Sequence, residues 1–107
     1  MRWIKIDKPQ SWNTLLFFKA KIKTLDPLYF STAQQLRQKA LSQFRCIHFE
    51  ALTEGLSEIA LSYWHDLSDI HAWHLDAEHQ VAQQLGHNTW YENFSVEVCE
   101  VLRHYKR

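Results

Sequence analysis

The feature that most constrains the fold is a switch between two hydrophobic periods along the chain. Three segments place apolar residues at every second position, which is typical of β-strands, and they span residues 14–24, 46–51 and 58–64. A short turn around Gly55 separates the second segment from the third, so these two are expected to form an antiparallel hairpin. Residues 94–105 predict a fourth strand.

The strand patterns also predict which side chains share a face of the sheet. A row of lysines alternates with apolar residues from residue 18 to residue 23, and these lysines are expected to face water or to guard an exposed sheet edge. In the second strand, Phe49 should lie on the face opposite to Cys46. The fourth strand has apolar residues on both faces, Val96 on one and Cys99 on the other, which indicates that both faces are covered.

Between the strands, apolar residues recur at steps of three and four, as they do on one face of a helix. The first stripe comprises Tyr29, Ala33, Leu36, Ala40 and Phe44, and the second comprises Ile70, Trp73, Ala77, Val81 and Leu85. Asp26 is expected to cap the first helix, with Pro27 as its first residue and Arg37 on its solvent side. Ser68 or Asp69 is expected to cap the second helix.

The resulting order, β-α-β-β-α-β, is that of the ferredoxin-like fold. It predicts an α+β domain in which two helices cover one face of a four-stranded antiparallel sheet. A last short turn is expected at residues 89–94. We expect one domain over residues 1–107, with an N-terminal extension at 1–13 and the core at 14–105. Because the other face of the sheet is also apolar, a second copy of the chain is expected to cover it in a homodimer.

Charge and cysteine usage restrict the function classes. The chain has 12 Lys and Arg residues and 12 Asp and Glu residues, so it has no net basic charge for nucleic acid or for an anionic membrane surface. Its longest purely apolar run, Leu15–Phe18, is far too short for a membrane span, and no secretory signal is visible. The isolated cysteines, Cys46 and Cys99, are expected to be reduced thiols of a cytoplasmic protein, with a disulfide between them as the alternative.

Residues 62–92 hold five of the seven histidines, which raises the question of a metal site. His71, His74 and Glu78 are spaced to share one helix face and could supply three ligands to a catalytic zinc ion. This face lies away from the apolar stripe, however, so a solvated polar face is the favoured interpretation and no metal is expected. Neither an HExxH nor a GxSxG motif is present, and two glycines cannot form a phosphate loop.

Two motifs resemble those of the antibiotic biosynthesis monooxygenase family, which consists of small dimeric α+β barrel proteins. They are SYWHDLSDIHAWHLDAEH at residues 62–79 and WYENFSVEVCEVLRHY at residues 90–105, and the resemblance covers about residues 15–105. It implies a homodimer in which two sheets close a β-barrel and each subunit has a pocket between sheet and helices. Members of this family include cofactor-free oxygenases of polyketide phenols, quinol monooxygenases and haem-degrading monooxygenases.

The haem-degrading branch fits this chain poorly. Trp73 matches a tryptophan of that branch, but Gln83 stands where its haem-ligating histidine is expected, ten residues further on. The asparagine of its first strand has no counterpart except Asn13, at the very start of the strand. An axial histidine ligand must have a ring nitrogen that reaches the haem iron, and no histidine stands at the matching position. Haem is therefore disfavoured as a cofactor.

The resemblance therefore implies a monooxygenase without a tightly bound cofactor, acting on a phenolic or quinol-like molecule. His79 is expected to act as base or hydrogen-bond donor and Trp73 to take part in catalysis, with a purely structural role as the alternative for both. The expected pocket walls are Tyr63, Trp64, Trp90 and Tyr91. The other function classes are a small-molecule-binding or stress-related dimer without catalysis and muconolactone-isomerase-like chemistry.

Overall fold

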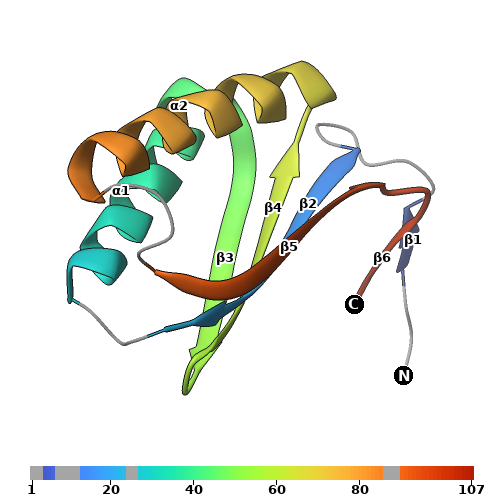
Figure 1. Ribbon diagram of the computed structural model, residues 1–107. Coiled ribbons are helices and arrows are strands. Elements are labelled where there is room, and N and C mark those ends of the chain that lie inside the picture. Colours follow the sequence, from blue (N-terminus) through green and yellow to red (C-terminus); the bar gives the residue numbers. More distant parts are fainter. Residues whose placement is uncertain (1–3, 7–12, 24–26, 86–89) are drawn as a thin grey trace.

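The computed structural model describes residues 4–6, 13–23, 27–85 and 90–107, and it gives only the backbone for 4–6 and 78–85. Strands β2 (Thr14–Ile22), β3 (Cys46–Glu54), β4 (Ser57–Trp64) and β5 (Tyr91–Glu100) form one antiparallel sheet in the order β3-β4-β2-β5. Helices α1 (Pro27–Gln43) and α2 (Leu67–Leu85) lie side by side on one face of this sheet (Figure 1). The α+β class and the β-α-β-β-α-β core are therefore confirmed.

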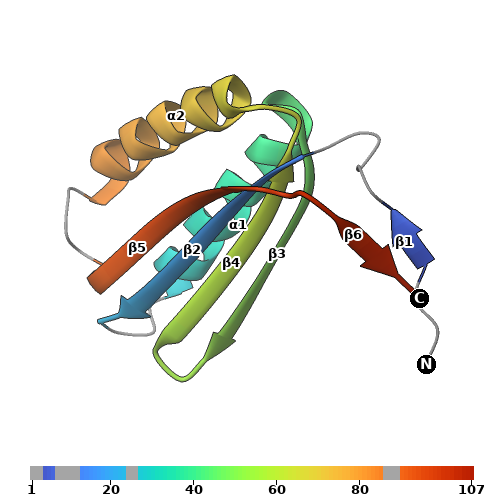
Figure 2. The same cartoon turned by 90° about the vertical axis from the view of Figure 1, so that its right-hand side faces the viewer.

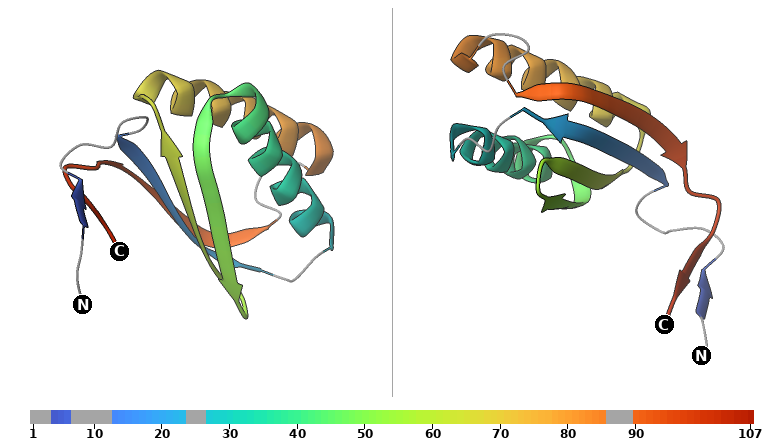
Figure 3. Two further views of the ribbon diagram at one scale, coloured as in Figure 1. Left: turned by 180° about the vertical axis from the view of Figure 1, so that it is seen from behind. Right: turned by 60° about the horizontal axis from the view of Figure 1, so that its bottom comes forward.

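The chain ends form a second, smaller element. Strand β1 (Ile4–Ile6) pairs antiparallel with β6 (His104–Lys106) in a two-stranded ribbon. The ribbon projects from the sheet on the side away from the helices (Figures 2 and 3). The predicted fourth strand is thus divided, because pairing with β2 stops at Glu100 and the chain then turns toward β1. None of the helices in the described part of the chain is long and apolar enough to cross a membrane.

Strand β2 is central, and its alternation follows from that position. Leu16, Ala20 and Ile22 are buried beneath the helices, while Lys19 and Lys21 are exposed on the open face of the sheet. The lysines therefore face water as predicted. The suggestion that they guard an edge is wrong, because β2 is hydrogen-bonded to β4 on one side and to β5 on the other.

The hairpin of β3 and β4 is confirmed, and both strands continue up to a tight turn. Glu54 pairs with Ser57, and Gly55 has a φ of 59°, which glycine adopts without a Cβ penalty. A register shift between Cys46 and His48 adds one residue at the other end of β3. Because of this bulge, Cys46 is buried in the same core cluster against which Phe49 packs, and the prediction of opposite faces is wrong.

The first turn of α2 has a cap one residue before the helix. The Asp66 Oδ1 atom accepts hydrogen bonds from the backbone N–H groups of Ser68 (2.9 Å) and Asp69 (3.2 Å) and from the Ser68 hydroxyl, which lowers the pKa of Asp66. The cap is therefore Asp66 and neither of the two residues predicted. In α1, Pro27 is the first helical residue as expected, whereas Asp26 lies outside the described residues.

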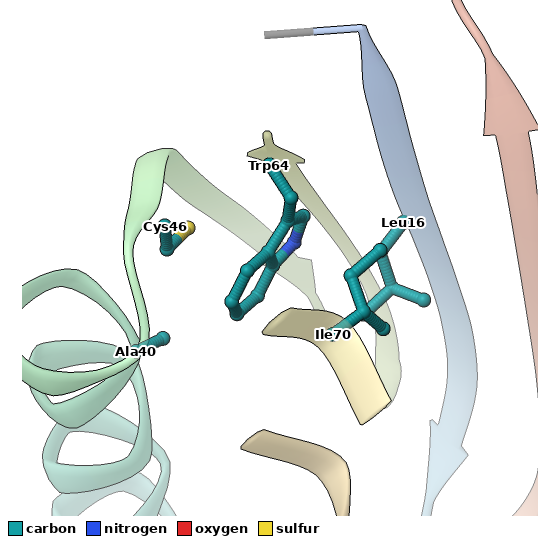
Figure 4. Packing of buried hydrophobic residues seen from close by; sticks show 5 residues of the cluster. All are labelled: Leu16, Ala40, Cys46, Trp64 and Ile70. Carbon is teal, nitrogen blue, oxygen red and sulfur yellow. The ribbon is translucent and has the colours of Figure 1, made fainter. Parts of the chain in front are cut away.

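The main core lies where both helices cross the sheet. Trp64 is fully buried at its centre and packs with Leu16, Ala40, Cys46 and Ile70 (Figure 4). Its indole Nε1 donates a hydrogen bond to the Ser62 hydroxyl oxygen at 2.8 Å, so the polar atom of this buried side chain is satisfied. A second cluster, formed by Ile22, Tyr29 and Trp90, lies under the start of α1.

Strand β5 is an edge strand that the single chain leaves partly uncovered. It begins at Tyr91, so the short turn predicted for residues 89–94 is wrong for Tyr91–Phe94. Val96 and Val98 face the helix side but remain 42% and 47% exposed. The expectation that both faces of this strand are covered is therefore not met within one chain.

Candidate functional site

A cavity of about 580 Å³ lies between the helix-covered face of the sheet and the two helices. Its volume is within the range of pockets that hold small organic ligands. The lining is largely apolar and aromatic, with a few polar groups. The residues that the following description uses are Phe18, Tyr29, Arg37, Phe49, Glu58, Trp73, His74, Trp90, Tyr91, Phe94 and Val96. Phe94 and Val96 are exposed, so the cavity is open along β5.

Aromatic rings gather at the end of the cavity where β5 begins. Phe18 makes an edge contact with Tyr91 (ring centroids 5.5 Å apart) and stacks with Phe94 (6.1 Å). Tyr29 lies edge-on to Trp90 at 5.2 Å. These rings come together because β2 and β5 are neighbours and the first turn of α1 lies over their ends. Such a surface suits the face or edge of an aromatic ligand.

A buried carboxylate lies at the same end of the cavity. Glu58 is only 7% exposed, because alternation along β4 turns it toward the helices together with Ala60, Ser62 and Trp64. The Tyr29 hydroxyl donates to its Oε2 atom, and the Thr53 hydroxyl donates to its Oε1 atom at 3.4 Å. A buried carboxylate is tolerated in a protein only when such hydrogen bonds compensate for the lost water.

A second phenol extends this hydrogen-bonded group. The Tyr91 hydroxyl donates to the Tyr29 oxygen at 3.3 Å, so the three residues form a chain that runs from Tyr91 through Tyr29 to Glu58. Burial raises the pKa of Tyr29 far above that of a free tyrosine, and its hydrogen bond to Glu58 adds to this effect. Burial also raises the pKa of Tyr91 to about 12. Both hydroxyls therefore stay protonated at neutral pH and can donate hydrogen bonds.

The raised pKa of Tyr91 predicts a change of stability in alkali. Its pKa is 10.0 without the fold and about 12 within it, so the unfolded state loses this proton first as the pH rises. The stabilisation is complete below pH 10.0 and is lost toward pH 12. We expect the urea midpoint of Tyr91→Phe to fall less steeply over this range than that of the unsubstituted chain. Equal slopes would contradict the prediction, and Tyr105→Phe, at a residue 45% exposed, is the control.

Three of the residues predicted from the sequence line the cavity, namely Trp73, Trp90 and Tyr91. The Trp73 indole Nε1 donates to the Leu36 carbonyl oxygen at 3.0 Å, which links α2 to α1. Its ring also packs against Phe49 at 5.8 Å and Trp64 at 5.5 Å. Trp73 is thus both a wall of the cavity and a part of the core, and its part in catalysis stays a prediction.

The other predicted residues lie elsewhere. Trp64 is fully buried in the core and does not line the cavity. Tyr63 alternates with Ser62 and Trp64 on β4, which turns it to the open face of the sheet, where its ring lies 5.8 Å from that of His48. Neither residue forms the pocket wall expected of it. His79 lies in α2, but its side chain is outside the described part, so its role as base stays a prediction.

The histidine-rich helix face gives no metal site within the described residues. His71 and His74 are both exposed, and the side chain of Glu78 is outside the described part. His74 lies at the rim of the cavity. Among the described side chains, no group of three His, Cys, Asp or Glu residues is placed to hold a metal ion.

The sequence interpretation missed two residues of the hydrogen-bonded group and misplaced a third residue of the cavity. Glu58 stands among the inward-facing positions of β4, and a charged residue at such a position was the available signal. Tyr29 was assigned to the apolar stripe of α1 without a role for its hydroxyl. Arg37 was placed on the solvent side of α1, whereas it is half-buried and lines the cavity.

Comparisons with known proteins give relatives without an assigned activity. No known protein-family profile matches the chain. The chain is 33% identical to the uncharacterized protein YqjZ of Bacillus subtilis (strain 168) over 79 residues, which are 73% of this chain and 69% of that protein.

Solved structures resemble the fold at low sequence identity. A protein of unknown function from Nitrosomonas europaea, NE2512, has a TM-score of 0.68 at 15% identity and covers 88% of this chain and 93% of its own. The protein SO0527 from Shewanella oneidensis has a TM-score of 0.69 at 12% identity and covers 99% of this chain and 100% of its own. At this level of identity, the likeness shows the fold alone.

Proposed function

The chain belongs to the same family as the Bacillus subtilis protein YqjZ, and we propose that it is a small monooxygenase that works without a tightly bound cofactor. Its substrate is a phenolic or quinol-like molecule bound in the cavity between sheet and helices. The observation that carries this proposal is the group formed by Tyr91, Tyr29 and Glu58 in a largely apolar and aromatic cavity. The resemblance to the antibiotic biosynthesis monooxygenases supports it, because Trp90 and Tyr91 of the second motif line this cavity.

The proposed chemistry needs only a base, hydrogen-bond donors and exclusion of water. The Glu58 carboxylate is the base that takes a proton from the substrate, and the resulting anion passes one electron to O₂. The hydroxyl of Tyr91 gives up its hydrogen bond to Tyr29 and donates to the developing oxyanion instead. In an anthrone-like substrate, a CH₂ group becomes a carbonyl group with one oxygen atom of O₂, and the other oxygen atom leaves as water with the two hydrogen atoms. In a hydroquinone, one ring C–H becomes C–OH, the two phenol groups become carbonyl groups, and the second oxygen atom leaves as water with two hydrogen atoms.

Oxygen uptake with a panel of hydroquinones and anthrone-like phenols tests this proposal. The expected result is one O₂ consumed per substrate molecule and one oxygen atom from ¹⁸O₂ in the product. Binding of the same compounds without oxygen uptake would instead support the alternative, a small-molecule-binding protein. A Soret shift on addition of haemin would favour the haem-binding branch.

We also propose that the protein is a homodimer in which two sheets face each other. The open face of each sheet carries Leu15, Phe17 and Leu61, which are half-buried in the single chain, and Leu52 and Ile59, which are 80% and 42% exposed. A monomer rarely exposes so many neighbouring apolar side chains, and a two-fold axis would bury the same patch on both copies. This arrangement would close the dimeric α+β barrel that the resemblance implies.

Light scattering after size exclusion measures the oligomeric state. The expected mass at micromolar concentration is twice that of the 12.8 kDa chain. Ile59→Glu places a charge on the open face and is expected to shift the mass toward that of the monomer, because a charge buried between two sheets lacks water. Leu75→Glu, on an exposed position of α2, should leave the mass unchanged. A monomeric parent chain would contradict the dimer.

The cysteines favour a reducing compartment, for which we propose the cytoplasm. Cys46 and Cys99 are both free thiols, as expected. Burial raises the pKa of Cys46 to about 11, so this thiol stays protonated and poorly nucleophilic at neutral pH. Its Sγ atom contacts the carbonyl oxygens of His48 at 3.3 Å and Tyr63 at 3.5 Å, which suits a structural residue.

A further inference from the structure

We propose that the cavity selects aromatic acids, and that Arg37 determines this specificity by binding the carboxylate of the ligand. The inference rests on the proposed function for the place of binding, but it concerns affinity and does not depend on turnover. Three observations support it. They are the position of Arg37 on the cavity wall, the absence of a counter-ion for its charge among the described residues, and its spacing along α1 from Tyr29.

The position of Arg37 is fixed by aromatic contacts. Its guanidinium carbon lies 5.7 Å from the centroid of the Phe49 ring, and that ring packs edge-on against Trp73. A guanidinium group over an aromatic face gains a cation–π attraction, and its two free edges remain available for other partners. Arg37 is therefore held against the wall of the cavity and does not extend into water.

The charge of Arg37 has no counter-ion in the described part of the chain. None of the ion pairs among the described residues involves it, and its Nε atom is buried without a hydrogen-bond acceptor. The buried carboxylate of the cavity, Glu58, is engaged by the hydroxyls of Tyr29 and Thr53 instead. The Nε atom is not accessible from the cavity, so a ligand carboxylate would be bound by the outer N–H groups of the guanidinium, whose planar geometry matches two carboxylate oxygens.

The spacing along α1 separates the two polar ends of the cavity. Arg37 follows Tyr29 by about two turns, so their backbone positions lie about 12 Å apart along the helix axis, and both residues line the cavity. The ligand that we infer has a hydroxyl group near Tyr91, beside Tyr29, and a carboxylate near Arg37, with an aromatic system of about two fused rings between them. The cavity volume of about 580 Å³ accommodates such a molecule.

A matched pair of ligands and two matched variants test the proposal. Hydroxynaphthoate, with its hydroxyl and carboxylate on different rings, is compared by calorimetry with naphthol, which lacks only the carboxylate. We expect the parent chain to bind the acid at least about tenfold more tightly, which is the scale of a charge-assisted hydrogen bond. Arg37→Met, which keeps the apolar stem of the side chain but lacks the guanidinium group, should lose this preference and bind naphthol as before.

The control variant is Arg103→Met, which removes the same group from an exposed position between β5 and β6 that does not line the cavity. It should keep the full preference for the acid. The proposal is overturned if the parent chain binds both compounds equally or binds neither, or if Arg103→Met loses as much preference as Arg37→Met. Absence of oxygen uptake would overturn the monooxygenase proposal alone, because the preference for the acid is measured by binding.

Discussion

Replacing Trp64 by alanine is expected to lower the free energy of unfolding by about 3–5 kcal/mol. The side chain is fully buried where both helices meet the sheet, and its removal would leave a cavity between Leu16, Cys46 and Ile70. The hydroxyl of Ser62, which is 1% exposed, would also lose the hydrogen bond that it accepts from the indole N–H group. Urea unfolding followed by circular dichroism measures the difference.

Leu75→Ala is the control for this prediction. It also shortens a large apolar side chain, but at a position of α2 that is 53% exposed. Its free energy of unfolding should change by no more than about 0.5 kcal/mol. If Trp64→Ala lost as little stability as Leu75→Ala, the assignment of Trp64 to the centre of the core would be wrong.

Replacing Glu58 by glutamine is expected to lower the rate of substrate oxidation by about 10²–10⁴-fold, the usual contribution of a general base. Glutamine has nearly the same shape and keeps an oxygen that can accept the hydrogen bond from Tyr29, but it cannot take up a proton. The fold should therefore persist, which circular dichroism would verify. The rate is measured with an oxygen electrode on the best substrate of the panel.

Two further variants identify the base. Glu54→Gln makes the same chemical change on an exposed carboxylate at the end of β3 and should leave the rate unchanged. His79→Asn removes the base that the sequence motif suggested. Retained turnover in Glu58→Gln together with lost turnover in His79→Asn would assign the proton transfer to His79 and remove Glu58 from the mechanism.

The order of the elements could be predicted because the relevant signals are local. Alternation in β2 and β4 and the stripes of α1 and α2 each lie within a few residues along the chain. The errors fall where a distant partner decides the outcome. The bulge that turns Cys46 inward depends on the pairing of β3 with β4. Likewise, Tyr91 belongs to a strand because it pairs with Ile22 of β2, which lies far from it in the sequence.

The same distinction separates the predicted site residues from the missed ones. Aromatic residues such as Trp73 and Trp90 could be proposed as cavity walls from their type alone. The pairing of Tyr29 with Glu58 could not, because α1 and β4 bring together residues that are 29 positions apart. Arg37 looked like a surface residue, since a polar side chain beside an apolar stripe can turn either way. In the structure it turns toward the ring of Phe49, a residue of β3 that no local pattern in α1 could indicate.

The central position of β2 has a consequence for the synthesis of the protein. β2 pairs with β4 and β5, both of which follow it in the chain, and β5 is the last strand of the main sheet to leave the ribosome. Until then, one edge of β2 has unpaired N–H and C=O groups beside exposed apolar side chains, which is the pattern that promotes association between nascent chains. Its pairing with β5 also closes a long loop, so folding should be completed late and slowly compared with that of a helical protein of this length.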